Sequence, residues 1–411
     1  MNTVAASRRI FYGWIIVALC TAIIALDFGL MFSYSVFFKP LADYFGWDRA
    51  SVSLVYSSSL IIGGAVSIGV GWLADRHSPG KLMAFCGLMI GSGLILSSRV
   101  HHLWQLFLTY GVIEATGLLS GFGISAALIS RWFSGNRGLP LGILASGSGL
   151  GTFLIVPLNE RLVDSLGWQS TFLIAGSVAG VLIIAFSFFL RKPLEPARIA
   201  STADGLSDPY AVERVPLTHT LADRKFALIM AAFFSFAFST QLVIIHLVNY
   251  ATDRGIDTLV ATSFVSVIGA ISIIGRLASG AGVSRVGTHN TLILTRAVVI
   301  VAFVILIFAQ SIPAFYVFAV FFSLAYGAEI TQIPLILSYY YGTRTIATLV
   351  SFNGLCVGVG GALGVWSGGK IFDNTQSYSE AFIIGAVVSV FSLVLMLVLK
   401  ARWTKKAGTQ P

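Results

Sequence analysis

Charged residues are scarce in this chain of 411 residues, because Asp, Glu, Lys and Arg together make up only 10% of it. A soluble domain carries about 25% charged residues, which cover its water-facing surface. Hydrophobic residues reach 56% of the chain. The composition therefore excludes an ordinary soluble protein and indicates that lipid is the outer solvent.

Cysteine is also scarce, and Cys20, Cys86 and Cys356 all lie in apolar stretches. An odd number in such places does not indicate a disulfide framework. The pair His101-His102 falls in a short loop, and we expect no metal site. The phosphate-binding pattern G-x-x-x-x-G-K-[ST] is missing as well, so ATP drive within this chain is unsupported and no cofactor is expected.

Long apolar runs dominate what is present. Each is long enough for a membrane-spanning helix of about 20 residues, whereas the strands of a membrane β-barrel would be shorter and would alternate apolar and polar residues. We predict an all-α membrane protein of twelve transmembrane helices, at 12–36, 52–74, 81–98, 104–130, 138–158, 170–190, 226–250, 261–282, 290–310, 313–338, 345–369 and 380–400. The one long polar interruption, 191–225, is predicted to link two six-helix bundles, at 1–190 and 226–411.

Basic residues are unevenly divided between the loops on the two sides. Positive charge is retained in cytoplasmic loops, so the richer side is the inner one. If both termini are cytoplasmic, the outer loops hold only Lys39, Arg49, Arg99, Arg161, Arg254 and Lys370 of the 26 Lys and Arg residues. We therefore expect both termini in the cytoplasm. The basic residues form no patch, so the net charge of +9 does not indicate a nucleic-acid partner.

The two predicted bundles resemble each other in sequence. The second span runs into Gly71-Trp72-Leu73-Ala74-Asp75-Arg76, and the eighth runs into Gly280-Ala281-Gly282-Val283-Ser284-Arg285. The fifth and eleventh spans are both lined with glycine, at Gly142, Gly147, Gly149 and Gly151 and at Gly354, Gly358, Gly360 and Gly361. Repeats of this kind relate the two halves of a large class of secondary transporters.

Over essentially its whole length the chain resembles the major facilitator superfamily. The stretch GWLADRHSPGK at 71–81 is close to that superfamily's signature between its second and third helices. The resemblance implies that Asp75 and Arg76 form a cytoplasmic gate that holds the two halves closed. The alternative is that they belong to an ordinary positively charged inner loop.

A narrower resemblance is to the monocarboxylate porter and oxalate/formate branch. It rests on Tyr12-Gly13-Trp14 at the first span, on Arg131-Trp132-Phe133 before the fifth, and on Arg276 in the eighth. Animal-type members carry an acid one turn before that arginine, where this chain has Ser272. The oxalate exchanger type adds a lysine in the eleventh span, where this chain has Asn353 and Cys356. The first departure puts the proton-coupling site that is familiar in this branch in doubt. The second argues against a dicarboxylate substrate, which would need two cations.

Arg276 lies inside an apolar span, where an unpaired guanidinium costs roughly 3 kcal/mol on insertion scales. Such a residue is expected to face a protein-lined interior and to mark a functional site. Its planar fork suits bidentate binding of a carboxylate. We predict that Arg276 binds the substrate carboxylate; the alternative is a salt bridge to Glu329 or Asp27.

Three acids and one histidine fall within spans that line the cavity in this superfamily: Asp27, Glu114, Glu329 and His246. Removal from water favours the neutral form of a carboxyl, so Glu114, and less strongly Asp27 and Glu329, are candidate proton carriers. His246 is a further candidate, or it hydrogen-bonds across helices. Arg296 lies near the start of its span, where snorkelling to the headgroups is the expected explanation.

Neutral side chains are expected to complete the substrate site. Tyr326, Glu329, Ile330 and Ile333 share a helical face, and so do Asn353 and Cys356. We predict substrate contacts from Tyr326, Asn353 and Cys356, or alternatively plain helix packing.

These features favour a secondary transporter, not an enzyme, that moves a small organic anion through the lipid bilayer by alternating access. We expect a monocarboxylate in symport with a proton. An organic-anion exchanger and a proton-driven drug or cation effluxer stay open as alternatives. The short loops and compact length favour a bacterial host and hence its cytoplasmic membrane, and a monomer is expected.

Overall fold

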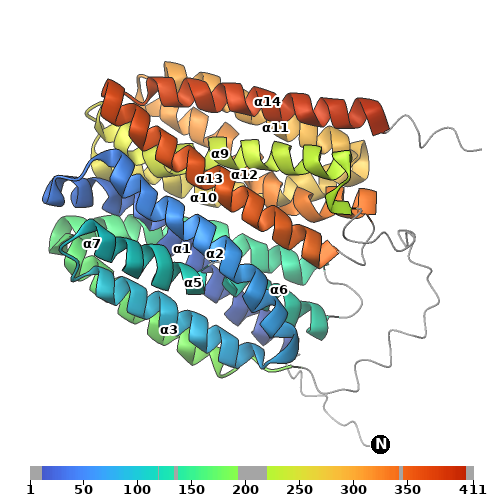
Figure 1. Cartoon of the computed structure of the whole chain (residues 1–411), viewed down its shortest axis with the longest axis horizontal. Helices are drawn as coiled ribbons and strands as arrows, with labels where there is room; N and C mark the ends of the chain where they lie inside the picture. Colours follow the sequence, from blue (N-terminus) through green and yellow to red (C-terminus); the bar gives the residue numbers. More distant parts are fainter. Residues whose placement is uncertain (1–11, 119, 134–137, 193–219, 342–345, 404–411) are drawn as a thin grey trace, which may run out of the picture.

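The chain is all-helical in the computed structural model, which describes residues 12–118, 120–133, 138–192, 220–341 and 346–403. No strand occurs in these ranges, and Figure 1 shows long helices lying side by side. In chain order the elements are α1 (Tyr12–Phe45), α2 (Arg49–Arg76), α3 (Pro79–Ser97), α4 (Leu103–Leu106), the π-helix η1 (Phe107–Glu114), α5 (Ala115–Leu118), α6 (Ser120–Trp132), α7 (Gly138–Ser187), α9 (Arg224–Thr252), α10 (Thr258–Val286), α11 (Thr288–Phe308), α12 (Ile312–Tyr341), α13 (Ile346–Thr375) and α14 (Ser379–Trp403).

Eleven helical segments of the described chain are long and apolar enough to cross a membrane. One of them, α7, has 50 residues and consists of two helices that meet at Gly167, where φ is 78° and ψ is 164°. A side chain at positive φ is strained, so glycine permits this reversal. The predicted span 138–158, and all but the last three residues of the predicted span 170–190, belong to α7.

Short polar signals define where several helices begin. The carboxylate of Asp48 accepts from the Ser51 amide at 2.6 Å ahead of α2. Asp257 accepts from the Leu259 amide at 2.9 Å ahead of α10, and Asp223 caps α9 in the same way. These caps satisfy amides that have no partner inside the helix. They fix where these three helices begin.

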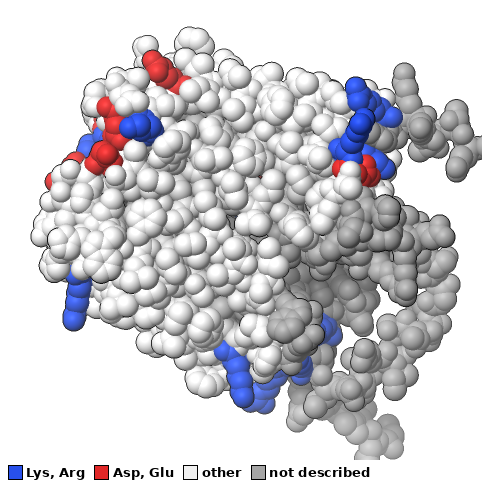
Figure 2. Space-filling model, viewed as in Figure 1, with Lys and Arg blue, Asp and Glu red and all other residues white. Residues whose placement is uncertain are grey.

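Charged side chains gather at the two ends of the molecule and leave a broad uncharged band between them (Figure 2). We call the end where α1 begins and α14 finishes the terminal end, and the end where α1 finishes and α2 begins the opposite end. The uncharged band runs along the length of the helices, as expected of a surface that faces lipid.

Two seams join the N-terminal helices α1–α7 to the C-terminal helices α9–α14: α7 packs on α10, and α2 packs on α13. In the first seam a Cβ at Gly149 would lie 2.5 Å from the Gly269 carbonyl oxygen, so only glycine allows this approach. In the second seam the Ser57 hydroxyl donates to the Ala362 carbonyl at 2.7 Å. Close backbone packing through small residues is a common way to join helices in lipid.

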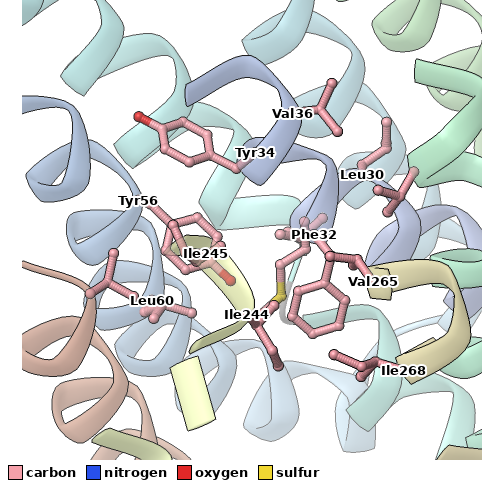
Figure 3. Packing of buried hydrophobic residues seen from close by; sticks show 14 of the residues in the cluster. Leu30, Phe32, Tyr34, Val36, Tyr56, Leu60, Ile244, Ile245, Val265 and Ile268 are labelled. Atoms are coloured by element: carbon pink, nitrogen blue, oxygen red, sulfur yellow. The ribbon is translucent and has the colours of Figure 1, made fainter. Parts of the chain in front are cut away.

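Among the described residues, a smaller cluster of buried apolar side chains lies within α9 and α11–α14, and a larger one draws on both sets of helices. Figure 3 shows part of it, where Phe32 of α1 approaches Ile244 of α9 and Val265 and Ile268 of α10. This packing places the middle of α1 directly against the C-terminal helices. The side chains of the predicted gate, Asp75 and Arg76, and residues 193–219 of the predicted linker lie outside the described part of the structure.

Candidate functional site

Arg276 lies near the middle of α10 and is 5% exposed. Its Nη1 donates to the Ala145 carbonyl oxygen of α7 at 2.7 Å, across the seam between the two sets of helices. Its Nε is buried without a hydrogen-bond acceptor among the described residues. No acid of the described chain forms an ion pair with it, so neither Asp27 nor Glu329 provides the salt bridge considered as an alternative.

A cavity of about 10 Å³ lies beside Arg276, between α1, α7, α9, α10 and α12. Its wall includes Phe32, Ser148, Ser272 and Tyr326. A space of this size holds about one water molecule. The guanidinium therefore has one neutral partner, spare donor capacity and a small adjoining space, which is what an anion oxygen needs.

A second cavity, of about 250 Å³, lies on the other side of Tyr326 and extends toward the terminal end. Tyr326, Glu329, Ile330 and Ile333 all line it, so the helical face inferred from their spacing is the face that meets the cavity. Across the cavity stand α1, α2, α9 and α13. Tyr326 lines both cavities. Its ring centroid lies 6.3 Å from that of Phe32 and 6.0 Å from that of Phe322.

Glu329 is paired, but with Arg296 of α11. Arg296 Nη1 donates to Glu329 Oε2 at 2.5 Å and Nη2 to Oε1 at 3.2 Å. The guanidinium also lies 4.1 Å from the centroid of the Phe236 ring. Arg296 is fully buried, so the expectation that it snorkels to the headgroups is wrong. The carboxylate of Glu329 offsets the cost of burying the guanidinium, because a bidentate Arg–carboxylate pair gives each charge an opposite partner.

Asp27 and Glu114 lie in the interior of the N-terminal helices. They are 2% and 0% exposed, and none of their carboxyl oxygens has a hydrogen-bond donor among the described residues. The two carboxyls are close enough to interact electrostatically. Glu114 ends the π-helical segment η1, a local widening that is frequent at functional sites.

Three tyrosines cluster beside Glu114, the second acid of this pair. The Tyr34 ring lies 5.3 Å from the Tyr56 ring and 4.8 Å from the Tyr110 ring, centroid to centroid. The hydroxyls of Tyr56 and Tyr110 are buried without partners in the described chain, whereas the Tyr34 hydroxyl donates to the Val52 carbonyl. Unpartnered polar atoms at this density mark a place where water or a proton could be accommodated.

Three other predicted site residues, Asn353, Cys356 and His246, do not line the cavity beside Arg276. Asn353 is buried, and the Cys356 thiol donates to the Met230 carbonyl at 3.4 Å. Neither residue lines the cavity beside Arg276 or the cavity of about 250 Å³, whereas Gly354 and Val357 of the same helix line the latter. His246 contacts the Val365 carbonyl and the Tyr378 hydroxyl, at 2.8 and 3.2 Å. The structure thus brings Tyr326 to Arg276, but not Asn353, Cys356 or His246.

Sequence reasoning missed a network of polar contacts around Arg49 at the opposite end, which joins α2 to the C-terminal helices. Arg49 at the start of α2 donates from Nη1 and Nη2 to the two carboxylate oxygens of Asp253, at 2.7 and 3.0 Å, and from Nη1 to the Tyr378 hydroxyl. Its guanidinium lies 3.6 Å from the centroid of the Phe372 ring. The carboxylate of Asp373 accepts from the amides of Arg49 and Ala50. A lone cation ahead of the second predicted span gives no signal in the sequence that its side-chain partners lie 204 and 329 residues away.

We predict that Arg49→Ala opens the opposite end. A partly buried, bidentate pair with a ring contact contributes more than an exposed salt bridge, on the order of 1–2 kcal/mol, so the open population should rise roughly 5- to 30-fold. The readout is labelling of Ser35→Cys by a membrane-impermeant maleimide in a variant without native cysteines. Ser35 lines a third cavity, of about 370 Å³, which lies between α1, α7, α9 and α10 at the opposite end. Arg161→Ala is the control, and equal labelling of all variants would contradict the prediction.

A scan against family models matches the Major Facilitator Superfamily over residues 17–365. Among curated proteins, the chain is 28% identical to monocarboxylate transporter 4 of Rattus norvegicus over 94% of its own length and 83% of the relative's. It is 25% identical to monocarboxylate transporter 12 of Homo sapiens, over 94% of this chain and 80% of that protein. It is also 28% identical to the uncharacterized MFS-type transporter YcxA of Bacillus subtilis, over 87% of each chain.

Solved structures of similar architecture include a bacterial homologue of the human lysosomal transporter Spinster, in an inward-facing and occupied conformation. Its TM-score is 0.76 at 15% identity, over 96% of this chain and 98% of that one. The nucleoside transporter NupG gives a TM-score of 0.72 at 14% identity, over 93% and 99% of the two chains. At these identities the likeness concerns the fold.

Proposed function

Because this chain belongs to the Major Facilitator Superfamily and is a membrane transporter rather than an enzyme, we propose that it carries a small monocarboxylate together with a proton. The observation that carries the proposal is Arg276: a buried cation at the seam between the two sets of helices, without an acidic partner in the described chain, beside a small cavity. Its relatives in the monocarboxylate branch support an anionic substrate.

The proposed architecture is twelve transmembrane helices in two bundles, 1–190 and 226–411, joined by the linker 191–225. The reversal of α7 at Gly167 supports this count, since it divides one segment into two helices. With both termini in the cytoplasm, the terminal end faces inward and the opposite end, locked by Arg49, faces outward. The two bundles rock about the seams, so the substrate site meets each side of the cytoplasmic membrane in turn.

In the proposed cycle the substrate carboxylate displaces the Ala145 carbonyl from Arg276. A carboxylate accepts a stronger, charge-assisted bond than a neutral carbonyl, so the exchange is favourable. Breaking the bond to Ala145 also removes a contact between α10 and α7. Anion binding is thereby coupled to movement at the seam.

Asp27 and Glu114 are the proposed proton carriers. A buried carboxylate without a donor is costly, so both groups are neutral when dry and can ionise when water enters. The proton carried with the substrate anion keeps the transported charge at zero. The pairing of Glu329 with Arg296 supports a structural role for that acid instead.

Uptake by purified protein in liposomes tests the proposed function. With an imposed proton gradient, radiolabelled lactate or phenylacetate should accumulate saturably, and other monocarboxylates should compete. Competition by tetraphenylphosphonium in place of carboxylates would favour a cation effluxer. Uptake that requires a counter-anion inside, and ignores the proton gradient, would favour an exchanger.

The proton carrier can be identified by neutral replacement. We expect Glu114→Gln to lose uptake driven by the proton gradient, by about tenfold or more, while retaining exchange of labelled for unlabelled acid. Asp27→Asn is tested in parallel, and Glu380→Gln, an exposed acid in the first turn of α14, serves as the control. If both replacements leave gradient-driven uptake intact, neither acid carries the proton.

A further inference from the structure

The cavity of about 250 Å³ is larger than a short-chain acid requires, and its wall is mostly apolar. Phe28 and Met31 of α1, Leu60 of α2, Phe236 of α9 and Val357 of α13 face it. Acetate or lactate bound at Arg276 would leave this space empty or filled with water against hydrocarbon. Apolar walls instead favour a ligand that covers them, because each apolar surface removed from water stabilises the complex.

The charges around the two cavities are unequal. Arg276, beside the small cavity, has no acidic partner in the described chain, whereas Glu329 at the large cavity is neutralised by Arg296. The site therefore offers one uncompensated positive charge at one end and a nearly neutral, apolar space at the other. A ligand that matches this distribution has a single carboxylate at one end and an uncharged apolar body.

Tyr326 stands at the junction of the two cavities and contributes to both walls. Its ring is stacked on Phe322, with the centroids 6.0 Å apart and an interplanar angle of 7°. A change of side-chain rotamer at Tyr326 would join the cavities. Its hydroxyl could then donate to the carboxylate held by Arg276.

We infer that the substrate is a monocarboxylate with a bulky apolar body, aromatic or branched aliphatic, rather than a short-chain acid. Resting on the proposed function, the inference assigns the carboxylate to Arg276 and Tyr326 and the body to the apolar cavity between α1, α2, α9, α12 and α13. Phenylacetate has this form, and acetate is its truncated counterpart.

Titration calorimetry on the purified full-length protein tests the inference with acetate, phenylacetate and the uncharged phenylacetamide. Burial of the phenyl ring should make phenylacetate bind about 30-fold more tightly than acetate. Phenylacetamide should bind much more weakly than phenylacetate, because it lacks the charge that Arg276 recognises.

The cavity can be filled without disturbing the fold. Gly354 lines it on α13, and a Cβ added there meets no atom within 4 Å. Gly354→Leu should therefore fold, occupy the cavity and remove the preference for phenylacetate, with acetate binding unchanged. Gly69→Leu is the matched control, since Gly69 is also helical and has no atom within 4 Å of an added Cβ, but lines none of the three cavities.

The outcomes separate the inference from the proposed function. Equal affinities for the two acids, or a preference that survives Gly354→Leu, overturn the inference; if Arg276→Gln still abolishes acid binding, the proposed function stands. Acid binding that survives Arg276→Gln, or acids that do not bind the wild-type protein at all, overturn both. Loss of the preference for phenylacetate in Gly354→Leu, but not in Gly69→Leu, supports the inference.

Discussion

Replacing Arg276 by alanine should lower the kcat/KM for carboxylate uptake by roughly 150-fold, which corresponds to about 3 kcal/mol. The loss is large because the substrate anion would enter a buried site without its charged, two-pronged donor. Initial rates of gradient-driven uptake in liposomes, taken over a range of substrate concentrations, measure the effect.

Two matched variants show whether the effect belongs to this guanidinium. Arg276→Lys keeps the charge but loses the planar fork, so its uptake should fall between the wild type and Arg276→Ala. Arg285→Ala removes an exposed arginine from the same helix and should transport normally. Wild-type uptake by Arg276→Lys would contradict bidentate recognition, and wild-type uptake by Arg276→Ala would contradict any role in binding.

The second large effect is on stability. Glu329→Gln should lower the free energy of unfolding by about 3–5 kcal/mol, because it leaves the fully buried Arg296 without a counter-charge. Reversible unfolding in mixed micelles, followed by circular dichroism, measures this loss.

The double variant Arg296→Met, Glu329→Leu is the control for that prediction. Replacing a buried ion pair by apolar residues of similar size is often neutral or stabilising, so the double variant should recover most of the lost stability. Unfolding of Glu329→Gln at the wild-type midpoint would show that the pair contributes little. Transport by the recovered double variant would show that Glu329 serves the fold rather than the proton.

The helices could be predicted well because hydropathy is a property of each segment alone. Long apolar runs must be helical in lipid, where every backbone amide needs an internal partner. The described residues of the predicted spans accordingly lie in helices, apart from up to three residues at some span ends. The face of α12 formed by Tyr326, Glu329, Ile330 and Ile333 followed from helical spacing, since it depends only on one helix.

Partners on different helices could not be predicted in the same way. Arg296 was misread because its distance from the span end suggested headgroups, whereas its acid lies 33 residues later on α12. Asn353 and Cys356 share a face of α13, but Gly354 and Val357 meet the cavity, so the rotation of the helix about its axis was the missing information. Arg49 and Asp253 needed the contact between the two sets of helices.

For Arg276, the sequence predicts the burial of the side chain but not its hydrogen-bond partner. Its type and its place in an apolar span indicated a protein-lined interior, and the structure buries it at the seam. Its partner is a backbone carbonyl, which every residue has and no sequence pattern marks. In the proposed cycle, breaking this bond to Ala145 couples substrate binding to movement of the two bundles.

A structure of the protein saturated with the tightest-binding acid of the phenylacetate series tests the central claim most directly. The account predicts the carboxylate within hydrogen-bond distance of the Arg276 guanidinium, with the bond to the Ala145 carbonyl broken. A bound carboxylate remote from Arg276, with the bond to Ala145 intact, would contradict it.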